Sequence, residues 1–183
     1  ALSDVADSAL ARLQASVTAD FVAQHGSFPD DGIGIVAFGK LGSRELTVTS
    51  DLDLVSVYDA PIDARSDGPR PLAAAPYHIR LTQRLITAIT SQTGEGKLYE
   101  ADMRLRPAGN DGPLATHLDY FSAYERDTAW TWEHMALTRA RPISGPAHLQ
   151  ERIVALRDEI LRAERDPLQL LADVAAMRER IEK

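Results

Sequence analysis

Two aspartates at the start of a predicted strand have the types and spacing of a divalent-metal site. An apolar run over 33–38 predicts a strand buried on both faces, and a second predicted strand over 52–58 begins between Asp51 and Asp53. Side chains alternate along a strand, so both carboxylates share one face. They repel each other unless a cation lies between them, and their hard oxygen atoms suit Mg²⁺.

Asp102 supplies a third carboxylate. The segment around it is predicted to be another strand, so Arg104 and Arg106 would lie on the same face as Asp102. A two-metal site needs acidic groups around ions about 3.5–4 Å apart. Asp51, Asp53 and Asp102 are therefore the candidate metal ligands and catalytic residues.

Residues close to the carboxylates in the sequence have the types that bind phosphate groups. Gly42 and Ser43 are expected at a loop or helix start, where free N–H groups can hold a phosphate, although Ser43 could instead cap a helix. Arg104 and Arg106 either balance the acidic cluster or bind a triphosphate through their guanidinium forks. Lys40 lies in a Gly-Lys pair, but Leu follows where a P-loop needs Ser or Thr. All five residues form the candidate nucleotide-binding set.

The predicted elements place these residues on a strand-bearing core over 1–115, followed by a helical region over 116–183. The helix over 77–92 joins two strands and is a candidate crossover. The other predicted elements are a helix over 3–24, a strand over 98–107, and helices over 117–127, 129–140, 147–164 and 167–182. This pattern predicts an α+β fold.

Composition excludes several classes of function. The 183 residues carry a formal net charge of −7, which argues against a general nucleic-acid surface. The absence of cysteine excludes disulfides and thiolate metal sites. No apolar stretch approaches the ~20 residues of a membrane span, and no signal-peptide pattern opens the sequence. Neither nucleic acid nor a membrane is an expected partner, and the expected location is the cytoplasm.

Three blocks of sequence resemble the bacterial glutamine synthetase adenylyltransferase/adenylyl-removing enzymes, within the polymerase-β-like nucleotidyltransferase superfamily. They are residues 38–55, residues 102–107 and the run over 129–141 that contains Trp-Thr-Trp-Glu-His, in the family's order. The resemblance implies a polymerase-β-like core, a small mixed sheet with flanking helices, followed by a helical region. That family carries two similar halves in a longer polypeptide, so this chain resembles one half.

The resemblance also implies an activity. It is the transfer of AMP from ATP to a tyrosine of glutamine synthetase, with release of pyrophosphate, as a control on nitrogen assimilation. Asp51 and Asp53 would hold two Mg²⁺ ions, or Mn²⁺, and Asp102 would hold the ion that acidifies the incoming hydroxyl. Regulation by glutamine and by the PII signal protein is implied by the resemblance alone.

Other functions stay open. The run around His134 resembles the C-terminal, adenylylating half, because the deadenylylating half usually has arginine at that place. The alternatives are phosphorolysis of adenylyl-tyrosine to ADP, a catalytically silent module that binds nucleotide or docks the synthetase, and transfer to a small molecule. Trp130 and Trp132 are expected to be packing residues rather than a base-stacking platform. Glu133 is expected either to form an ion pair on its helix or to orient a site arginine.

Overall fold

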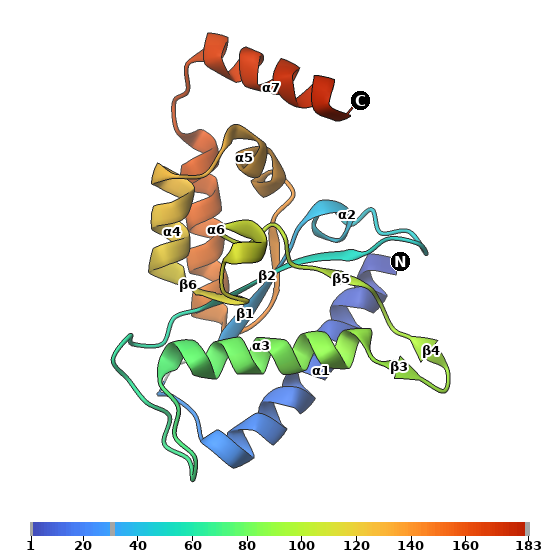
Figure 1. Cartoon of the computed structure of the whole chain (residues 1–183), viewed down its shortest axis with the longest axis vertical. Coiled ribbons are helices and arrows are strands. Elements are labelled where there is room, and N and C mark those ends of the chain that lie inside the picture. Colours follow the sequence, from blue (N-terminus) through green and yellow to red (C-terminus); the bar gives the residue numbers. More distant parts are fainter. Residues whose placement is uncertain (1, 30–31, 182–183) are drawn as a thin grey trace.

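The computed structural model describes residues 2–29 and 32–181, and its centre is a small mixed sheet of five strands (Figure 1). Its strands are β1 (Ile33–Ala37), β2 (Leu52–Tyr58), β5 (Ala101–Asp102), β6 (Ala115–His117) and β7 (Arg141–Ser144). β1 pairs antiparallel with both β2 and β7. β5 and β6 both pair parallel with β2, at its beginning and at its end respectively. The predicted α+β class with a mixed sheet is confirmed.

Two hydrophobic cores, one on each face of the sheet, hold β1 and β2 in place. Ile35 and Leu54 join the core formed with α1 (Leu2–His25) and α3 (Ala74–Thr90). Val36 and Val55 join the core formed with α4 (Leu118–Asp127) and α6 (Ala147–Arg162) on the opposite face. The near-continuous apolar sequences of both strands follow from this two-sided burial.

The remaining elements connect this framework. The predicted crossover is confirmed, because α3 leads from β2 to the parallel strand β5. A two-stranded hairpin, β3 (Gln92–Thr93) and β4 (Gly96–Lys97), lies between α3 and β5. The short helices are α2 (Gly39–Gly42), the 3₁₀ turn η1 (Gly109–Asp111) and α5 (Thr131–Leu137), and the last helix is α7 (Pro167–Ile181).

Two strands were missed in the region predicted to be helical. β6 starts at residue 115, where the predicted boundary lies, and β7 lies between α5 and α6. β6 has three residues, and β7 reads Arg-Pro-Ile-Ser, so neither is long enough for a hydrophobic period to be read. Both pair with the central strands, so the sheet draws on residues from both sides of position 115.

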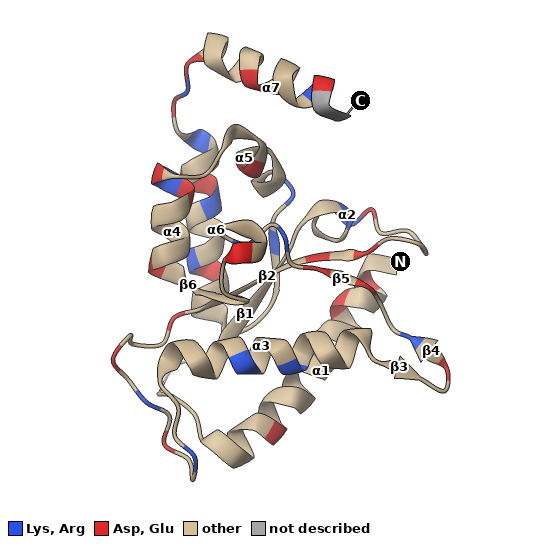
Figure 2. Ribbon diagram, viewed as in Figure 1, with Lys and Arg blue, Asp and Glu red and all other residues tan. Residues whose placement is uncertain are grey.

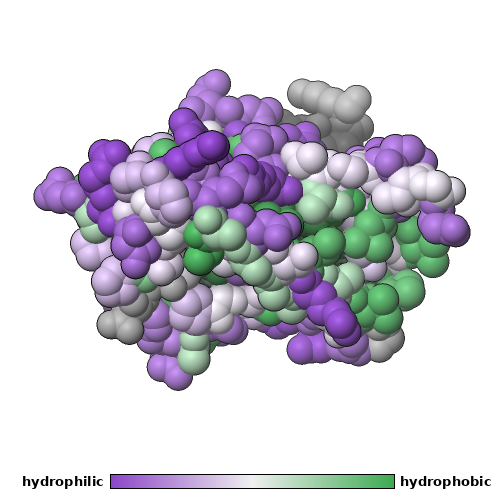
Figure 3. All heavy atoms as spheres, turned by 90° about the horizontal axis from the view of Figure 1, so that it is seen from below, coloured by the Kyte–Doolittle hydropathy of each residue, from purple (hydrophilic) through white to green (hydrophobic). Residues whose placement is uncertain are grey.

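Apolar side chains also reach the surface. On the face seen from below in Figure 1, hydrophobic and hydrophilic side chains are mixed, and the hydrophobic ones gather on one half (Figure 3). At the opposite end of the molecule, α7 exposes Leu168 and Leu171. None of the helices formed by the described residues combines the length and apolarity needed to cross a bilayer.

One carboxyl group is buried in the core between α4 and α6. Glu125 is 4% exposed, and its Oε2 atom has no hydrogen-bond partner among the described residues. His134 Nε2 lies 3.9 Å from that oxygen and 2.8 Å from the Glu125 carbonyl oxygen. Burial, and then the charge of Glu133, raises the pKa of Glu125 to about 7. Between pH 4.5 and about 7, Glu125 is therefore mostly protonated in the folded chain and mostly ionised in the unfolded chain.

This shift predicts a pH-dependent stability cost that Glu125→Gln removes. Because the folded-state pKa lies above the unfolded value, Glu125 destabilises the fold increasingly as pH rises from about 4.5 to about 7. At ~1.4 kcal/mol per pKa unit, the free energy of unfolding of Glu125→Gln should gain on the order of 3 kcal/mol relative to the parent between pH 4.5 and pH 8. Denaturant titrations of both proteins across this range measure the difference.

Glu159→Gln is the matched control. Glu159 lies on the neighbouring helix α6, and its hydrogen bond from Arg126 lowers its pKa. Its substitution should not give a relative gain in stability as pH rises. A difference between Glu125→Gln and the parent that stays constant with pH would contradict the assignment.

Candidate functional site

The pairing of β2 with β5 brings the predicted carboxylates together. Asp53 and Asp102 are direct partners in the parallel register, and Asp51 immediately precedes β2. Asp51 is exposed and Asp53 partly exposed, whereas Leu52 and Leu54 are fully buried, as the predicted alternation requires. Acidic segments at the beginning of β2 and on β5 lie beside α2 (Figure 2).

Helix α2 begins against the carboxylate of Asp53. The Phe38 N–H donates to the Asp53 carbonyl oxygen at 2.9 Å, and the chain then turns at Gly39, whose φ is +50°. A β-carbon at Gly39 would collide with Asp53 Oδ2. Glycine is therefore needed here for its left-handed conformation and for the close approach of the main chain. The exposed side chain of Lys40 follows at once, so α2 presents a cation next to the carboxylates.

The three carboxylates form one electrostatic group. Burial raises the pKa of Asp53, and the charges of Asp102 and then Asp51 raise it further. The positive charges of Arg104 and Lys40 act in the opposite direction on the same pKa. The site thus combines three carboxylates with two nearby cations.

Asp102 is held by Arg104 in a tight turn. The predicted strand over 98–107 is confirmed only for Ala101 and Asp102. Beyond Asp102 the chain turns, because the Arg104 main-chain N–H donates to Asp102 Oδ1 at 2.8 Å. Arg104 Nε also donates to both carboxylate oxygens, at 3.0 and 2.8 Å. The side-chain hydrogen bond from Arg104 is the main cause that lowers the pKa of Asp102.

Arg106 does not share a face with Asp102, contrary to the prediction from strand spacing. Its side chain is buried, and it donates to the carbonyl oxygens of Met103, Gly112 and Asn110 at 2.7, 3.0 and 3.1 Å. The turn at Asp102 directs Arg106 into the loop that follows. Arg106 holds that loop together and is not directed at the carboxylates.

Gly42 and Ser43 lie at the end of α2 rather than at a helix start. Ser43 Oγ donates to the Gly39 carbonyl oxygen at 3.1 Å and to Glu45 Oε2 at 2.8 Å, so the hydroxyl stabilises the turn. A β-carbon at Gly42 would collide with the carbonyl oxygen of Arg139. The role of Gly42 is to let α2 pack against the chain that enters β7.

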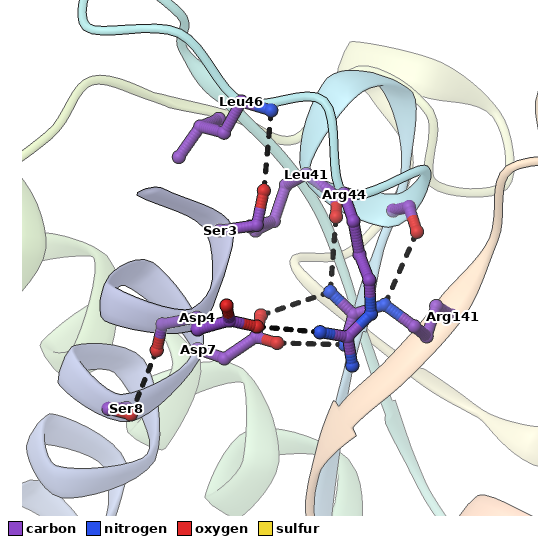
Figure 4. Close-up of polar contacts among 9 residues, drawn as sticks. Ser3, Asp4, Asp7, Ser8, Leu41, Arg44, Leu46 and Arg141 are labelled. Carbon is purple, nitrogen blue, oxygen red and sulfur yellow. Dashed lines mark hydrogen bonds and ion pairs between the residues drawn. The ribbon is translucent and has the colours of Figure 1, made fainter. Parts of the chain in front are cut away.

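Arg141 holds α2 in place, and sequence reasoning did not assign it to the site. It donates to the carbonyl oxygens of Leu41 and Gly42 at 3.1 and 3.2 Å, and to Asp7 of α1 at 2.9 and 3.1 Å (Figure 4). Arg44 forms a separate ion pair with Asp4 at 2.7 Å. Asp7 and Arg141 are 134 positions apart, so no local pattern could reveal their contact.

The Trp-Thr-Trp-Glu-His block packs differently from the expectation. Trp130 and Trp132 are 71% and 43% exposed, so neither belongs to the core. Glu133 accepts hydrogen bonds from the Tyr124 hydroxyl and the Trp130 main-chain N–H, both at 2.8 Å, and so caps α5. Burial, and then the bond to Glu133, raises the pKa of Tyr124 to about 12. The polar contacts found for Glu133 in the described part of the chain involve no arginine.

The donor set suits hard cations, although its side chains do not enclose one. Across residues 2–29 and 32–181, no three Asp, Glu or His side chains converge on a point where a metal ion could sit. The Asp102 carboxylate is turned toward Arg104. Burial, and then the negative charges of Asp102 and Asp51, raise the pKa of Asp53, and carboxylate oxygens are ligands that fit Mg²⁺.

Comparisons with known proteins agree with the sequence blocks. Residues 1–155 match the family model described as glutamate-ammonia ligase adenylyltransferase. Proteins named bifunctional glutamine synthetase adenylyltransferase/adenylyl-removing enzyme are similar over the whole chain. The protein from Brucella suis biovar 1 (strain 1330) is 51% identical over 182 residues, which are 99% of this chain and 18% of that protein. The protein from Mesorhizobium japonicum (strain LMG 29417 / CECT 9101 / MAFF 303099) is 49% identical over 184 residues, which are 100% of this chain and 19% of that protein.

The chain therefore spans less than a fifth of the length of these relatives. The matched region contains β2, β5, α2 and the residues that hold them together. The chain belongs to the glutamate-ammonia ligase adenylyltransferase family.

Proposed function

We propose that this chain carries a nucleotidyltransferase centre that moves AMP from ATP to a tyrosine of glutamine synthetase. The observation that carries the proposal is the register of β2 and β5, which places Asp53 beside Asp102. Asp51 lies two residues before Asp53. The substrate is taken from the names of the relatives, which are glutamine synthetase adenylyltransferases. A polymerase-β-like core, with α2 and the acidic strand pair as its active part, and a cytoplasmic location belong to the same proposal.

Asp51, Asp53 and Asp102 would hold two divalent cations, with Mg²⁺ as the expected metal and Mn²⁺ as the alternative. When bound, these ions would neutralise the triphosphate and lower the pKa of the acceptor hydroxyl. Arg104 lowers the pKa of Asp102, so its carboxylate stays ionised and is a weak base. Before metal binds, Asp102 is therefore ionised, as a residue must be that would hold the ion lowering the pKa of the acceptor hydroxyl.

The reaction forms a bond between the tyrosine oxygen and the α-phosphorus of ATP. The bond from that phosphorus to the oxygen of the leaving pyrophosphate breaks, and the tyrosine proton passes to solvent water. Lys40 and Arg104 are the exposed cations beside the carboxylates, and they would bind the triphosphate. Catalysis then rests on positioning and charge neutralisation.

The preference for adenylylation rests on His134, which is not part of the acidic cluster. Its two ring nitrogens contact the Glu125 carbonyl oxygen and, at 3.3 Å, Arg165. Transfer of AMP and its phosphorolytic removal would use the same three carboxylates. Regulation by glutamine and by the PII signal protein belongs to the proposal for the longer polypeptide.

Removal of the paired charges tests the centre. The variant Asp51→Asn/Asp53→Asn keeps the side-chain shapes but loses the charge that binds metal. With α-labelled ATP, Mg²⁺ and unmodified glutamine synthetase, its label transfer should fall about 10²-fold or more. Asp63→Asn, on an exposed loop, is the control and should transfer label like the parent. Phosphate-dependent release of ADP from adenylylated synthetase, without forward transfer, would show that the chain is the deadenylylating half.

Arg141→Gln tests whether the placement of α2 matters for nucleotide binding. The substitution removes the donors to Leu41 and Gly42 and leaves Asp7, whose side chain is 19% exposed, without its partner. We expect a loss of about 1–3 kcal/mol in the free energy of unfolding and about tenfold weaker binding of Mg²⁺-ATP. Denaturant titration and calorimetric ATP titration measure the two effects.

Arg44→Gln is the control for this prediction. It breaks the neighbouring pair with Asp4, whose side chains are 57% and 61% exposed, and exposed pairs of this kind contribute only about 0–1 kcal/mol. Its ATP affinity should match that of the parent. Equal effects of Arg44→Gln and Arg141→Gln would rule out a specific role for the Arg141 contacts.

A further inference from the structure

Arg104 occupies the carboxylate that the proposed metal would need. Its guanidinium donates to both oxygens of Asp102, and its main-chain N–H fixes Oδ1. A carboxylate engaged in this way cannot present both of its oxygens to a metal ion. Among the described residues, no three acidic side chains or histidines are grouped so that they could hold a metal ion.

Arg104 also acts beyond Asp102. The charges of Asp53 and Asp51 both raise the pKa of Arg104, after the larger effect of Asp102 itself. In turn, the charge of Arg104 lowers the pKa of Asp53. Arg104 is therefore the counter-ion of the whole acidic cluster and supplies, in part, the positive charge that a divalent cation would supply.

The two ends of this ion pair differ in freedom. The Arg104 side chain is 73% exposed, whereas that of Asp102 is 18% exposed. Asp102 also keeps its bond from the Arg104 main-chain N–H, which does not depend on where the guanidinium lies. The guanidinium can therefore leave while the carboxylate and the turn stay in place. Arg106, buried and bonded to three carbonyl oxygens, has no such freedom.

We propose that Arg104 is an exchangeable counter-ion, which neutralises Asp102 before metal binds, gives up the carboxylate to the metal and then binds the triphosphate. This inference rests on the proposed function, because it assumes that the carboxylates bind metal and nucleotide. Arg104 would thus have both of the roles that the sequence leaves as alternatives: it first balances the acidic cluster and later binds the triphosphate. Metal without nucleotide competes with Arg104, whereas nucleotide gives the displaced guanidinium a new partner.

The exchange predicts opposite effects of Arg104→Gln on two ligands. Mn²⁺ alone should bind several-fold more tightly, up to about fivefold, because its competitor is gone and an exposed ion pair is weak. Mg²⁺-ATP should bind about tenfold more weakly, because a charge-assisted bond to phosphate is lost. Electron paramagnetic resonance of free Mn²⁺ and calorimetric titration of Mg²⁺-ATP measure the two affinities without any catalytic turnover.

Arg104→Lys keeps the charge but cannot bridge both carboxylate oxygens, so both affinities should lie between those of the parent and Arg104→Gln. Thermal unfolding of each variant checks that the fold is intact, as expected for a side chain this exposed. If Mn²⁺ binds folded Arg104→Gln no more tightly than the parent, Arg104 does not compete for the carboxylates and the proposal is overturned. Unchanged binding of Mg²⁺-ATP would also overturn it.

The Asp51→Asn/Asp53→Asn variant separates this inference from the proposed function. Loss of Mn²⁺ binding in that variant, together with unchanged affinities in Arg104→Gln, would remove the exchange and leave the metal centre standing. Equal Mn²⁺ binding by the parent and by Asp51→Asn/Asp53→Asn would remove the metal centre, and the exchange with it.

Discussion

Repulsion among three carboxylates is the constraint on which the rest of the site depends. Asp53 and Asp102 are fixed opposite each other by main-chain pairing, so they cannot relax apart without breaking the sheet. Burial of Asp53 strengthens the repulsion, because a charge is less well screened away from water. Arg104 and Lys40 offset the repulsion in part, because both lower the pKa of Asp53.

The framework must be rigid enough to hold these groups together. β1 and β2 are buried on both faces, between α1 and α3 on one side and α4 and α6 on the other. α2 has only four residues and packs one large apolar side chain, Leu41, into the core. Its place is fixed by the close contacts of Gly39 and Gly42 and by the bonds that Arg141 makes to its last carbonyl groups. The position of α2 thus depends on contacts with β7 and, through Arg141, with α1.

The acidic strand could be read from the sequence because its signals are local. The alternation around Asp51 and Asp53 can be recognised from neighbouring residues alone. The long helices can be predicted from the spacing of their apolar residues. The turn after Asp102 could not be predicted, because polar and apolar residues alternate in Asp-Met-Arg-Leu-Arg as they do in a strand. The turn forms through the hydrogen bond that the Arg104 N–H donates to the Asp102 carboxylate. The strand prediction for that segment was wrong for this reason, and it misplaced Arg106 as well.

Other features depend on distant partners. β6 and β7 are strands only because β2 and β1 offer them edges. Arg141 pairs with Asp7, which is 134 positions away, so no sequence periodicity indicates the contact. The burial of Glu125 likewise depends on the packing of helices that are separate in the sequence. The sequence therefore predicts local features, such as the acidic face at the start of β2, better than the distant contacts that position them. How these residues bind metal and nucleotide stays a prediction.

The contact between Arg141 and α2 also limits the order in which this part of the protein can assemble during translation. Synthesis runs from the N-terminus, and all three carboxylates have been translated by residue 102. β7, which flanks β1, and the arginine that fixes the end of α2 are translated about forty residues later. A nascent chain between these two points has its acidic groups but lacks the strand and the side chain that hold the turn beside them. Within this chain, the contacts that hold the end of α2 can therefore form only after Arg141 has been translated.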